Sequence, residues 1–415
     1  VLLDDIGADQ LGSYGIGETV APTPTLDCLA ERGVRFTRAW AAPLCSPGRA
    51  ALETGRLADR TTMGYNVLGD GMMPLEEVTL GELAHQAGYT TGLVGKWHLS
   101  GWDSPLGVDA PRMQGFDTFE GTLDNLDAPW VPEHGDDADQ DYHGYQWIRN
   151  GAIHWTRRYA MAVDADASLD FIRATEGPWL LVSAFHAAHT PIHEAPGRLT
   201  TQKVPKDPTP DEKYRSMVEA ADTELGRLLQ GIDRDVLADT TIVVVSDNGT
   251  STFGTIPPFD KAKAKATLYE GGLHVPMIVA GPHVAVPGST SDALVSLVDV
   301  FPTVAELLGV EPPAELDGVS FAAQLADPTT PGPAFVAASW SPDEGYDRAI
   351  RGERYKLITR SNGEAELYDL AADPLETVNL LSAPLDLDAA AGLATLQDAL
   401  GDGIAPVRYT EPSSG

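Results

Sequence analysis

The chain of 415 residues is long enough to bury a large core, as one large domain or two. Hydrophobic residues make up 43% of it and charged residues 21%, a balance typical of a folded globular protein. The net charge of −33 argues against nucleic acid as a partner, because such a partner requires clustered lysine and arginine. No apolar run approaches the roughly eighteen residues that span a bilayer, so we expect no membrane partner.

Short apolar runs alternate with longer helical patterns along most of the chain, which is typical of an α/β fold. The sequence therefore predicts a large, mostly parallel sheet sandwiched by helices. The predicted strands are Val1–Leu3, Thr90–Val94, Trp179–Phe185, Thr241–Val245 and Val275–Ala280, and the predicted helices are Leu80–Ala87, Asp211–Gly231 and Leu294–Leu308.

The pattern changes after a Pro/Thr/Gly-rich stretch at Asp327–Pro333, which indicates a linker. Beyond it, short strands, an Asn362–Gly363 hairpin turn and an Ala/Leu-rich helix near Leu387–Leu400 predict a small antiparallel α+β subdomain. We therefore expect a catalytic domain over residues 1–328 and a subdomain over residues 334–415 packed on it. The strands expected there are Phe335–Trp340, Tyr355–Thr359 and Glu366–Tyr368.

Polar and charged side chains follow four of the predicted strands, at the point where each strand ends. Ligands of open α/β sheets collect beyond the carboxyl ends of the strands, so four such clusters favour one shared site. The residues are Asp4 and Asp5 after the first strand, Lys96 and His98 after the second, His186 and His189 after the third, and Asp247 and Asn248 after the fourth.

Asp4, Asp5, Asp247 and Asn248 offer only hard oxygen ligands, which suit Ca²⁺ or Mg²⁺ better than zinc. A divalent ion held there would neutralise charge on a sulfuryl or phosphoryl group. The alternatives are a solvated strand exit for the aspartate pair and a simple turn at Asp247–Gly249.

Cys45 begins the run Cys45-Ser46-Pro47-Gly48-Arg49, whose proline and arginine suggest a loop entering a helix. The helix N-terminus would favour an anion at Cys45, and Arg49, one turn later, would add a forked positive charge. The alternative is a buried structural cysteine. Cys28 lies in an amphipathic helical run, and we expect it to serve packing.

Three further groups have chemistry suited to such a site. His98 titrates in the range needed for proton transfer near neutral pH, and His189 is a candidate acid for a departing oxygen. Lys265 would supply another cation, unless it is one of three surface lysines with Lys261 and Lys263. His189 and His193 have a zinc-like spacing, but Pro191 between them argues against the helix that zinc binding would need.

The run Cys45-x-Pro47-x-Arg49, followed by Thr54-Gly55, resembles the signature of the type I, formylglycine-dependent sulfatases of the alkaline phosphatase superfamily. Other blocks resemble that family in the same order along the chain. They are Asp4-Asp5, Gly95-Lys96-Trp97-His98, His189-Thr190-Pro191, Ser246-Asp247-Asn248-Gly249, Lys265 through Gly272, Arg354-Tyr355-Lys356-Leu357 and Glu366-Leu367-Tyr368-Asp369-Leu370. His274 departs from the pattern, since an arginine often follows the Glu-Gly-Gly block, and the first strand is short for the family.

The resemblance implies that a maturation enzyme, formylglycine-generating or anaerobic, oxidises Cys45 to formylglycine (3-oxoalanine). Its hydrate would attack the sulfate ester, and Arg49 would support that hydrate. His189 would assist the leaving alcohol, and His98 would take the proton that lets the sulfated hemiacetal collapse. The resemblance further assigns calcium to Asp4, Asp5, Asp247, Asn248 and the residue at position 45, and it assigns the sulfate group to Lys96 and Lys265.

The sequence thus favours a calcium-dependent sulfatase acting on a carbohydrate or aryl sulfate. The alternatives are a phosphonate or phosphate ester hydrolase of the same superfamily and an unmatured glycan-binding pseudoenzyme. The acidic loop Glu133–His143 is typical of a solvated connection. The alternative is that it forms a sugar-binding rim with Trp130, Trp147 and Trp155, although we expect at least two of these tryptophans in the core. We expect a periplasmic or secreted location, with the cytoplasm as the alternative, although no signal peptide is visible.

Overall fold

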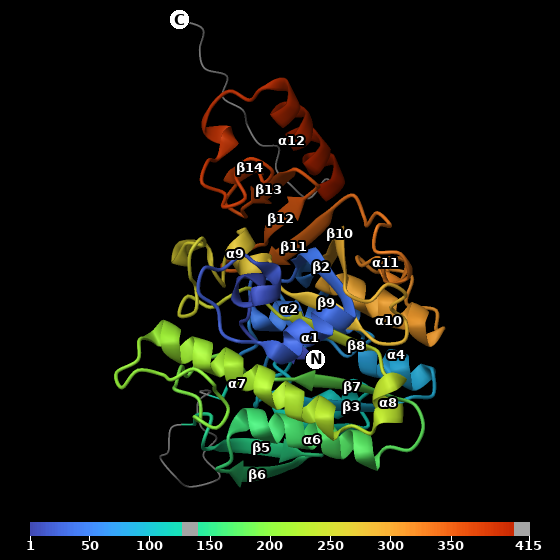
Figure 1. Cartoon of the computed structure of the whole chain (residues 1–415). Coiled ribbons are helices and arrows are strands. Elements are labelled where there is room, and N and C mark those ends of the chain that lie inside the picture. Colours follow the sequence, from blue (N-terminus) through green and yellow to red (C-terminus); the bar gives the residue numbers. More distant parts are fainter. Residues whose placement is uncertain (127–139, 402–415) are drawn as a thin grey trace, which may run out of the picture.

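The computed structural model describes residues 1–126 and 140–401, which form a ten-stranded sheet and a four-stranded sheet (Figure 1). The larger sheet has the order β10-β2-β9-β8-β1-β7-β3-β4-β5-β6, and β8, β1, β7, β3 and β4 in its centre are mutually parallel. Its strands are β1 (Leu2–Leu3), β2 (Gly33–Trp40), β3 (Thr90–Lys96), β4 (Thr118–Thr122), β5 (Tyr145–Arg149), β6 (Ala152–Thr156), β7 (Trp179–Ala184), β8 (Ile242–Ser246), β9 (Met277–Ala280) and β10 (Ser289–Ser296).

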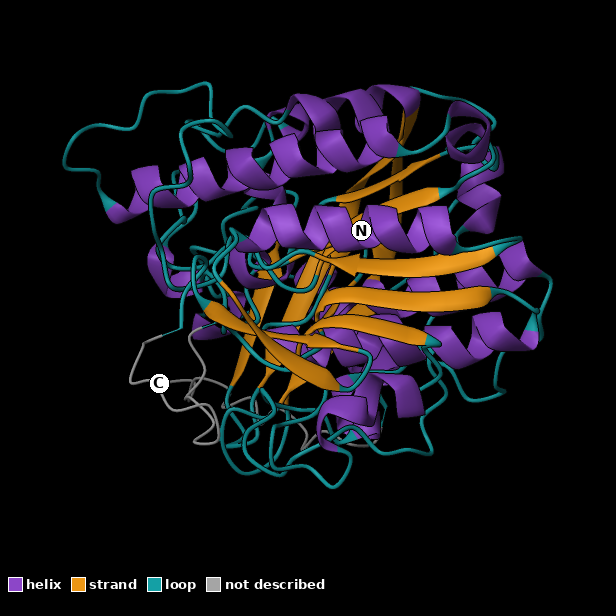
Figure 2. Cartoon of the chain, turned by 90° about the horizontal axis from the view of Figure 1, so that it is seen from below, coloured by secondary structure: helices purple, strands orange, loops and turns teal. Residues whose placement is uncertain are grey.

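Helices cover both faces of the larger sheet (Figure 2). One face packs against α1, α6 and α7, and the other against α2, α4, α10 and α11. The helices are α1 (Pro24–Arg32), α2 (Cys45–Thr54), α3 (Ala58–Thr61), α4 (Leu80–Gln86), α5 (Ala110–Met113), α6 (Ala160–Ala174), α7 (Pro210–Gly231), α8 (Arg234–Ala238), α9 (Glu270–Leu273), α10 (Val300–Leu308), α11 (Ala322–Ala326) and α12 (Leu387–Leu400).

The central strands are apolar throughout because both of their faces are buried. In β8, Val244 packs into the core shared with α6 and α7, whereas Val243 and Val245 face the core shared with α2 and α10. This is the two-residue alternation of a pleated strand, applied to a strand covered on both sides. Because β8, β1, β7 and β3 are parallel, their carboxyl ends meet at one edge of the sheet.

The smaller sheet is antiparallel, in the order β11 (Val336–Trp340), β12 (Asp347–Arg351), β13 (Tyr355–Thr359) and β14 (Ala365–Asp369). Helix α12 covers one face, and the other packs against Trp40, Leu44 and Leu268 of the larger unit. The predicted hairpin between β13 and β14 is confirmed: Gly363 adopts φ +88° and its N–H donates to the Arg360 carbonyl.

The predicted fold class is confirmed, and each predicted strand is present with its bounds shifted by two residues or fewer. The helix predicted over Leu294–Leu308 is confirmed for Val300–Leu308 (α10), but its predicted start at Leu294 is wrong. Strand β10 continues to Ser296, and the side chains of Ser296 and Asp299 then form a capping box that starts the helical segment. The predicted packing role of Cys28 is also wrong, because its side chain is exposed on α1. The domain boundary between residues 328 and 334 stays a prediction, and residues 402–415 lie outside the described part.

Strand β2 was missed altogether, although it is hydrogen-bonded along both of its edges, to β10 on one side and to β9 on the other. In the part of the chain that the structure describes, no helix combines the length and the apolar character that crossing a bilayer requires.

Candidate active site

The polar residues after the four central strands converge at one edge of the larger sheet. Asp4 and Asp5 directly follow β1, and Asp247 follows β8 with its N–H bonded to the Leu3 carbonyl at 3.1 Å. Asp4 N–H donates to the Ala187 carbonyl of the segment after β7 at 3.0 Å. These bonds continue the ladder past the strand ends, so the side chains come together because the strands are parallel.

Asp5 adopts a left-handed conformation, with φ 63°, and so does His98, with φ 58°. Non-glycine residues rarely adopt this conformation, and those that do concentrate at functional sites where surrounding contacts impose it. Asp5 lies two residues after β1 and His98 two residues after β3, where the left-handed turn directs each side chain toward the site.

Helix α2 begins at Cys45, as predicted, and its first turn is pressed against the end of β8. A Cβ on Gly48 would lie 2.0 Å from the Asp247 carbonyl oxygen, so only glycine permits this approach. Asn66 accepts a hydrogen bond from Ser46 N–H at 3.1 Å, and Ser46 Oγ donates to the His98 carbonyl at 2.7 Å. Cys45 is thereby fixed between the β8 and β3 strand ends.

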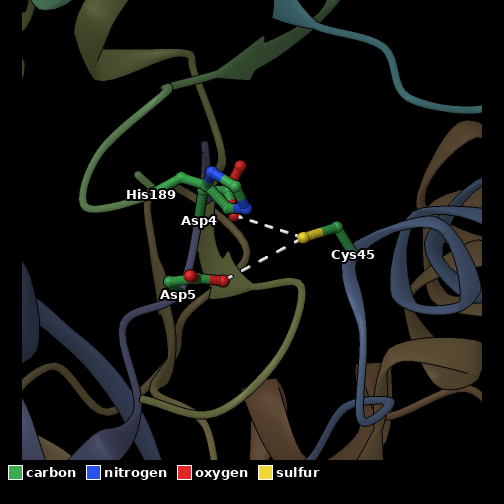
Figure 3. Close-up of side chains that lie close together, drawn as sticks. All are labelled: Asp4, Asp5, Cys45 and His189. Carbon is green, nitrogen blue, oxygen red and sulfur yellow. Dashed lines mark hydrogen bonds between the residues drawn. The ribbon is translucent and has the colours of Figure 1, made fainter. Parts of the chain in front are cut away.

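Cys45 points at the aspartate pair (Figure 3). Its Sγ lies 3.5 Å from Asp4 Oδ1 and 4.0 Å from Asp5 Oδ1. Lys265 Nζ donates to the same sulfur at 3.2 Å and to Asp5 Oδ1. Candidate ligand atoms of Asp4, Asp5, Cys45 and His189 all lie within 4.8 Å of one another.

Arg49 ties the two halves of the carboxylate cluster together. Its Nε donates to Asp247 Oδ2 at 2.9 Å, and its Nη2 donates to Asp4 Oδ2 at 3.2 Å. Lys96 Nζ donates to the same Asp4 oxygen at 2.6 Å. Three carboxylates (Asp4, Asp5, Asp247) thus face three cations (Arg49, Lys96, Lys265), so a divalent cation added here would leave the cluster positive and ready for an anion.

The electrostatics disfavour a thiolate at Cys45. Burial, together with the neighbouring Asp4, raises the pKa of this thiol well above its usual value. Asp4 itself is ionised: burial opposes its charge, but the positive charges of Lys96, Arg49 and Lys265 outweigh burial and hold its pKa well below the usual range. In these surroundings the unmodified thiol is a poor nucleophile, because burial and the nearby Asp4 carboxylate both disfavour its thiolate.

Both candidate histidines are neutral in these surroundings. Burial, then Lys96, lowers the pKa of His98 to about 3, and burial, then Lys265, lowers that of His189 to about 4. His98 Nε2 pairs with Asp124 Oδ1 at 3.1 Å, while its Nδ1 is buried without a hydrogen-bond partner among the described residues. The pKa of His98 therefore lies below the near-neutral range expected from the sequence. Because Nε2 is paired with Asp124, Nδ1 is the ring nitrogen that is left able to accept a hydrogen bond or a proton.

The residues present fit a hard divalent cation. Asn248 Nδ2 donates to Asp5 Oδ1 at 2.9 Å, which leaves Asn248 Oδ1 buried and without a hydrogen-bond partner within the described ranges. A buried amide oxygen without a partner is costly, and a cation that prefers oxygen ligands would satisfy it. Asp4, Asp5, Asp247 and Asn248 are all buried.

The structure brings every predicted site residue into one network, with His98 joined through Asp124 and Ser46. Lys265 is not a surface lysine, since its side chain is only 13% exposed. Asp124, Ser46 and Asn66 were missed as supporting residues. Ser46 stands at a variable position of the Cys45 run, and nothing in the local sequence marks Asp124 or Asn66.

Other predicted residues have supporting positions. His186 is buried, with Nδ1 3.0 Å from Asp164 Oδ2 and Nε2 2.9 Å from Thr122 Oγ1. His193 Nδ1 lies 3.0 Å from the Pro191 carbonyl, in keeping with the argument against zinc. His274 Nε2 lies 2.9 Å from the Thr37 carbonyl on β2, which is a structural contact.

The tryptophans expected at the rim differ in their burial. Trp147 is buried and Trp155 is exposed, while Trp130 and residues 133–139 of the acidic loop lie outside the described residues.

Comparison with protein families gives matches over most of the chain. Residues 1–310 match the family model described as Sulfatase, and residues 259–396 match that described as N-sulphoglucosamine sulphohydrolase, C-terminal. Human arylsulfatase A is 32% identical over 433 aligned residues, covering 92% of this chain and 82% of the relative. N-acetylgalactosamine-6-sulfatase of Sus scrofa is 33% identical, covering 77% of this chain and 64% of the relative, just under two thirds of its length.

The fold has solved counterparts. The structure of BT4656 in complex with its substrate D-glucosamine-2-N,6-O-disulfate superposes with a TM-score of 0.76 at 22% identity, covering 96% of this chain and 95% of that one. At this identity the likeness concerns the fold.

Proposed function

The chain belongs to the sulfatase family, and on that premise we propose that it is a calcium-dependent hydrolase of carbohydrate sulfate esters, with residue 45 converted to formylglycine. The observation that carries the proposal is the buried cluster in which Asp4, Asp5 and Asp247 face Arg49 and two lysines around position 45. The comparisons favour a sulfate ester over the phosphonate or phosphate ester and the unmatured glycan-binding alternatives.

Calcium would be held by Asp4, Asp5, Asp247, Asn248 and the residue at position 45, and it would polarise a sulfuryl oxygen and offset its charge. Calcium is preferred to magnesium because the carboxylate and amide oxygens come from two separate strand ends, after β1 and after β8, and calcium accepts irregular coordination. The orphaned Asn248 Oδ1 supports the presence of a cation.

Formylglycine at position 45, in its hydrated form, would supply an oxygen nucleophile in place of the buried thiol. Arg49 would keep Asp4 and Asp247 in fixed orientation, since its guanidinium binds both. Lys96 and Lys265 would hold the sulfate oxygens. His189 would donate a proton to the departing alcohol, and His98 would accept one at its free Nδ1.

The preference for a carbohydrate sulfate rests on the relative named N-acetylgalactosamine-6-sulfatase, and an aryl sulfate is the simpler surrogate. The partners are then a sulfated glycan and a maturation enzyme that oxidises Cys45. A periplasmic or secreted location suits a glycan substrate, and the cytoplasm stays the alternative.

The test is expression with and without a formylglycine-generating enzyme, followed by intact-mass analysis of the peptide containing Cys45 and an assay of sulfate release. We expect activity to follow the fraction of formylglycine and to vanish in Cys45→Ala. Full activity with an unmodified thiol would rule the mechanism out. Faster turnover of phosphate diesters than of sulfates in parallel assays would favour the phosphate alternative.

A further inference from the structure

Four charged side chains form a buried cluster between the two sheets, far along the chain from most of the site residues. Lys356 Nζ on β13 lies 3.1 Å from Glu270 Oε1 and 2.7 Å from Glu376 Oε1. Arg351 Nη1 on β12 lies 3.2 Å from Glu270 Oε2. We call Glu270, Arg351, Lys356 and Glu376 the inter-sheet ion cluster.

Each charge in this cluster has an opposite charge within 3.2 Å, and such pairing is the condition under which buried charges are tolerated. Glu376 Oε2 accepts the Glu270 backbone N–H at 2.6 Å, and Glu270 Oε1 also accepts Trp40 Nε1–H at 3.1 Å. The Lys356 ammonium lies 4.6 Å from the centre of the Trp40 ring, which adds a cation–π contact. Ordinary apolar packing would hold two sheets together at lower desolvation cost, so the geometry favours a positioning role.

The cluster holds the loop that carries Lys265. Glu270 begins α9, five residues after Lys265, and Lys263 Nζ on the other side donates to the Leu375 carbonyl at 3.3 Å and to the Glu376 carbonyl. The loop is therefore anchored to residues 375–376 on both sides of Lys265.

The same loop is bonded to the site. Lys265 N–H donates to the Thr250 carbonyl at 2.9 Å, and Ala266 N–H donates to the Pro43 carbonyl at 2.9 Å. Ala266 adopts φ +65°, a conformation that costs free energy and persists only where neighbouring contacts impose it.

We propose that the inter-sheet ion cluster positions Lys265, so that the smaller sheet sets how tightly the active site holds a sulfate group. The role given to Lys265 rests on the proposed function. A lysine side chain is long and flexible, so the place of its ammonium depends on where its backbone is held. Without Lys356, Glu376 would lose its ion-pair partner while Glu270 would keep Arg351, so the repulsion between the two carboxylates would rise and the loop would shift away from Cys45.

The test compares the matured wild-type enzyme with Lys356→Met, using an aryl sulfate as substrate and inorganic sulfate as inhibitor. We expect KM and the sulfate inhibition constant to rise by about tenfold to a hundredfold, the range that a displacement of about 1 Å produces, with a smaller change in kcat. Arg354→Met is the matched control, because Arg354 begins the same hairpin but pairs with Asp369 at the surface. Unchanged KM and sulfate inhibition in Lys356→Met would overturn the proposal.

A second readout does not depend on turnover. Acetic anhydride labelling followed by mass spectrometry measures the accessibility of each lysine, and in Lys356→Met we expect Lys265 to label several-fold faster while Lys96 stays protected. Equal gains at both lysines would indicate general loosening and overturn the proposal. Where Lys356→Met fails to fold, Glu270→Gln removes the charge at constant shape and is read in the same way. Absence of turnover in the wild type would count against the proposed function alone.

Discussion

His98 is oriented by a residue that does not itself reach the cysteine. Asp124 Oδ1 lies 3.1 Å from His98 Nε2, and the Asp124 carbonyl accepts the Thr122 hydroxyl at 2.7 Å, which fixes the carboxylate beyond β4. Since this contact occupies Nε2, it fixes the tautomer and leaves Nδ1 as the nitrogen that would accept a proton in the proposed mechanism.

Asp124→Asn should therefore lower kcat by about ten- to a hundredfold, the usual effect of removing a partner that orients an imidazole, with little change in the free energy of unfolding. Steady-state kinetics and urea unfolding measure the two quantities. Glu120→Gln is the control, because Glu120 lies on β4, the strand that precedes Asp124, but pairs with Arg149 at the surface. Equal activity of the asparagine variant and the wild type would show that His98 needs no such support.

At the scale of elements, the position of α2 depends on one glycine. Gly48→Ala would gain up to about 1 kcal/mol in helix propensity, but its Cβ would meet the Asp247 carbonyl at 2.0 Å, and overpacking of this kind costs about 1–3 kcal/mol. The cost of the clash exceeds the gain in helix propensity, because the close atom belongs to the backbone of Asp247 and cannot move aside as a flexible side chain would. We expect a loss of unfolding free energy and weaker calcium binding, measured by urea unfolding and calorimetry. Gly197→Ala, where a Cβ meets nothing within 4 Å, should be neutral.

Glu53 on the same helix gives a pH dependence with a definite sign. Burial raises its pKa from 4.5 to about 8, against the smaller opposing effects of the Leu80 backbone and Arg49. Between those two values the folded state holds a proton that the unfolded state releases, so the free energy of unfolding falls as the pH rises, by about 1 kcal/mol per unit.

Glu53→Gln should remove this contribution, so that the variant gains stability relative to the wild type from pH 5.5 to 7.5. Urea unfolding at several pH values measures the difference, and Glu31→Gln, on the exposed side of α1, should not alter the slope. Parallel pH profiles of the wild type and Glu53→Gln would show that Glu53 is ionised in the folded protein.

The elements also explain which features were predictable. Asp4, Asp5, Asp247 and Asn248 were found because apolar runs mark parallel strands, and parallel strands bring their ends together. The role of Asp124 and the contact between Gly48 and Asp247 were not predicted. Each depends on a tertiary contact between segments far apart in the sequence, which no local pattern encodes. The end of β10, Leu294–Ser296, was assigned to the following helix because apolar residues continue directly from the strand into the helix, and only the capping box separates the two elements.

At the scale of the whole molecule, a net charge of −33 surrounds a site that must attract an anion. The three cations of the site are already matched by three carboxylates, so the protein alone offers a sulfate no local excess of positive charge. A divalent cation would give the site a net positive charge. It would also lower the pKa of Asp247, which burial and Asp4 raise to about 6. The metal is thus expected to contribute to stability as well as to catalysis.

Chelator-treated protein should gain stability when calcium is added, because a ligand that binds only the folded state stabilises it by mass action. The gain should reach about 2.7 kcal/mol at a calcium concentration a hundred times the Kd, measured by thermal unfolding across a calcium titration. Magnesium should require higher concentrations, since it demands regular octahedral geometry and loses its waters reluctantly. Asp247→Asn should weaken the response to calcium. Asp9→Asn should retain it, because the Asp9 carboxylate is already bonded to Thr250 and Gln10. If the unfolding temperature of the wild-type protein does not change with calcium, the carboxylates of the cluster are neutralised by Arg49, Lys96 and Lys265 alone.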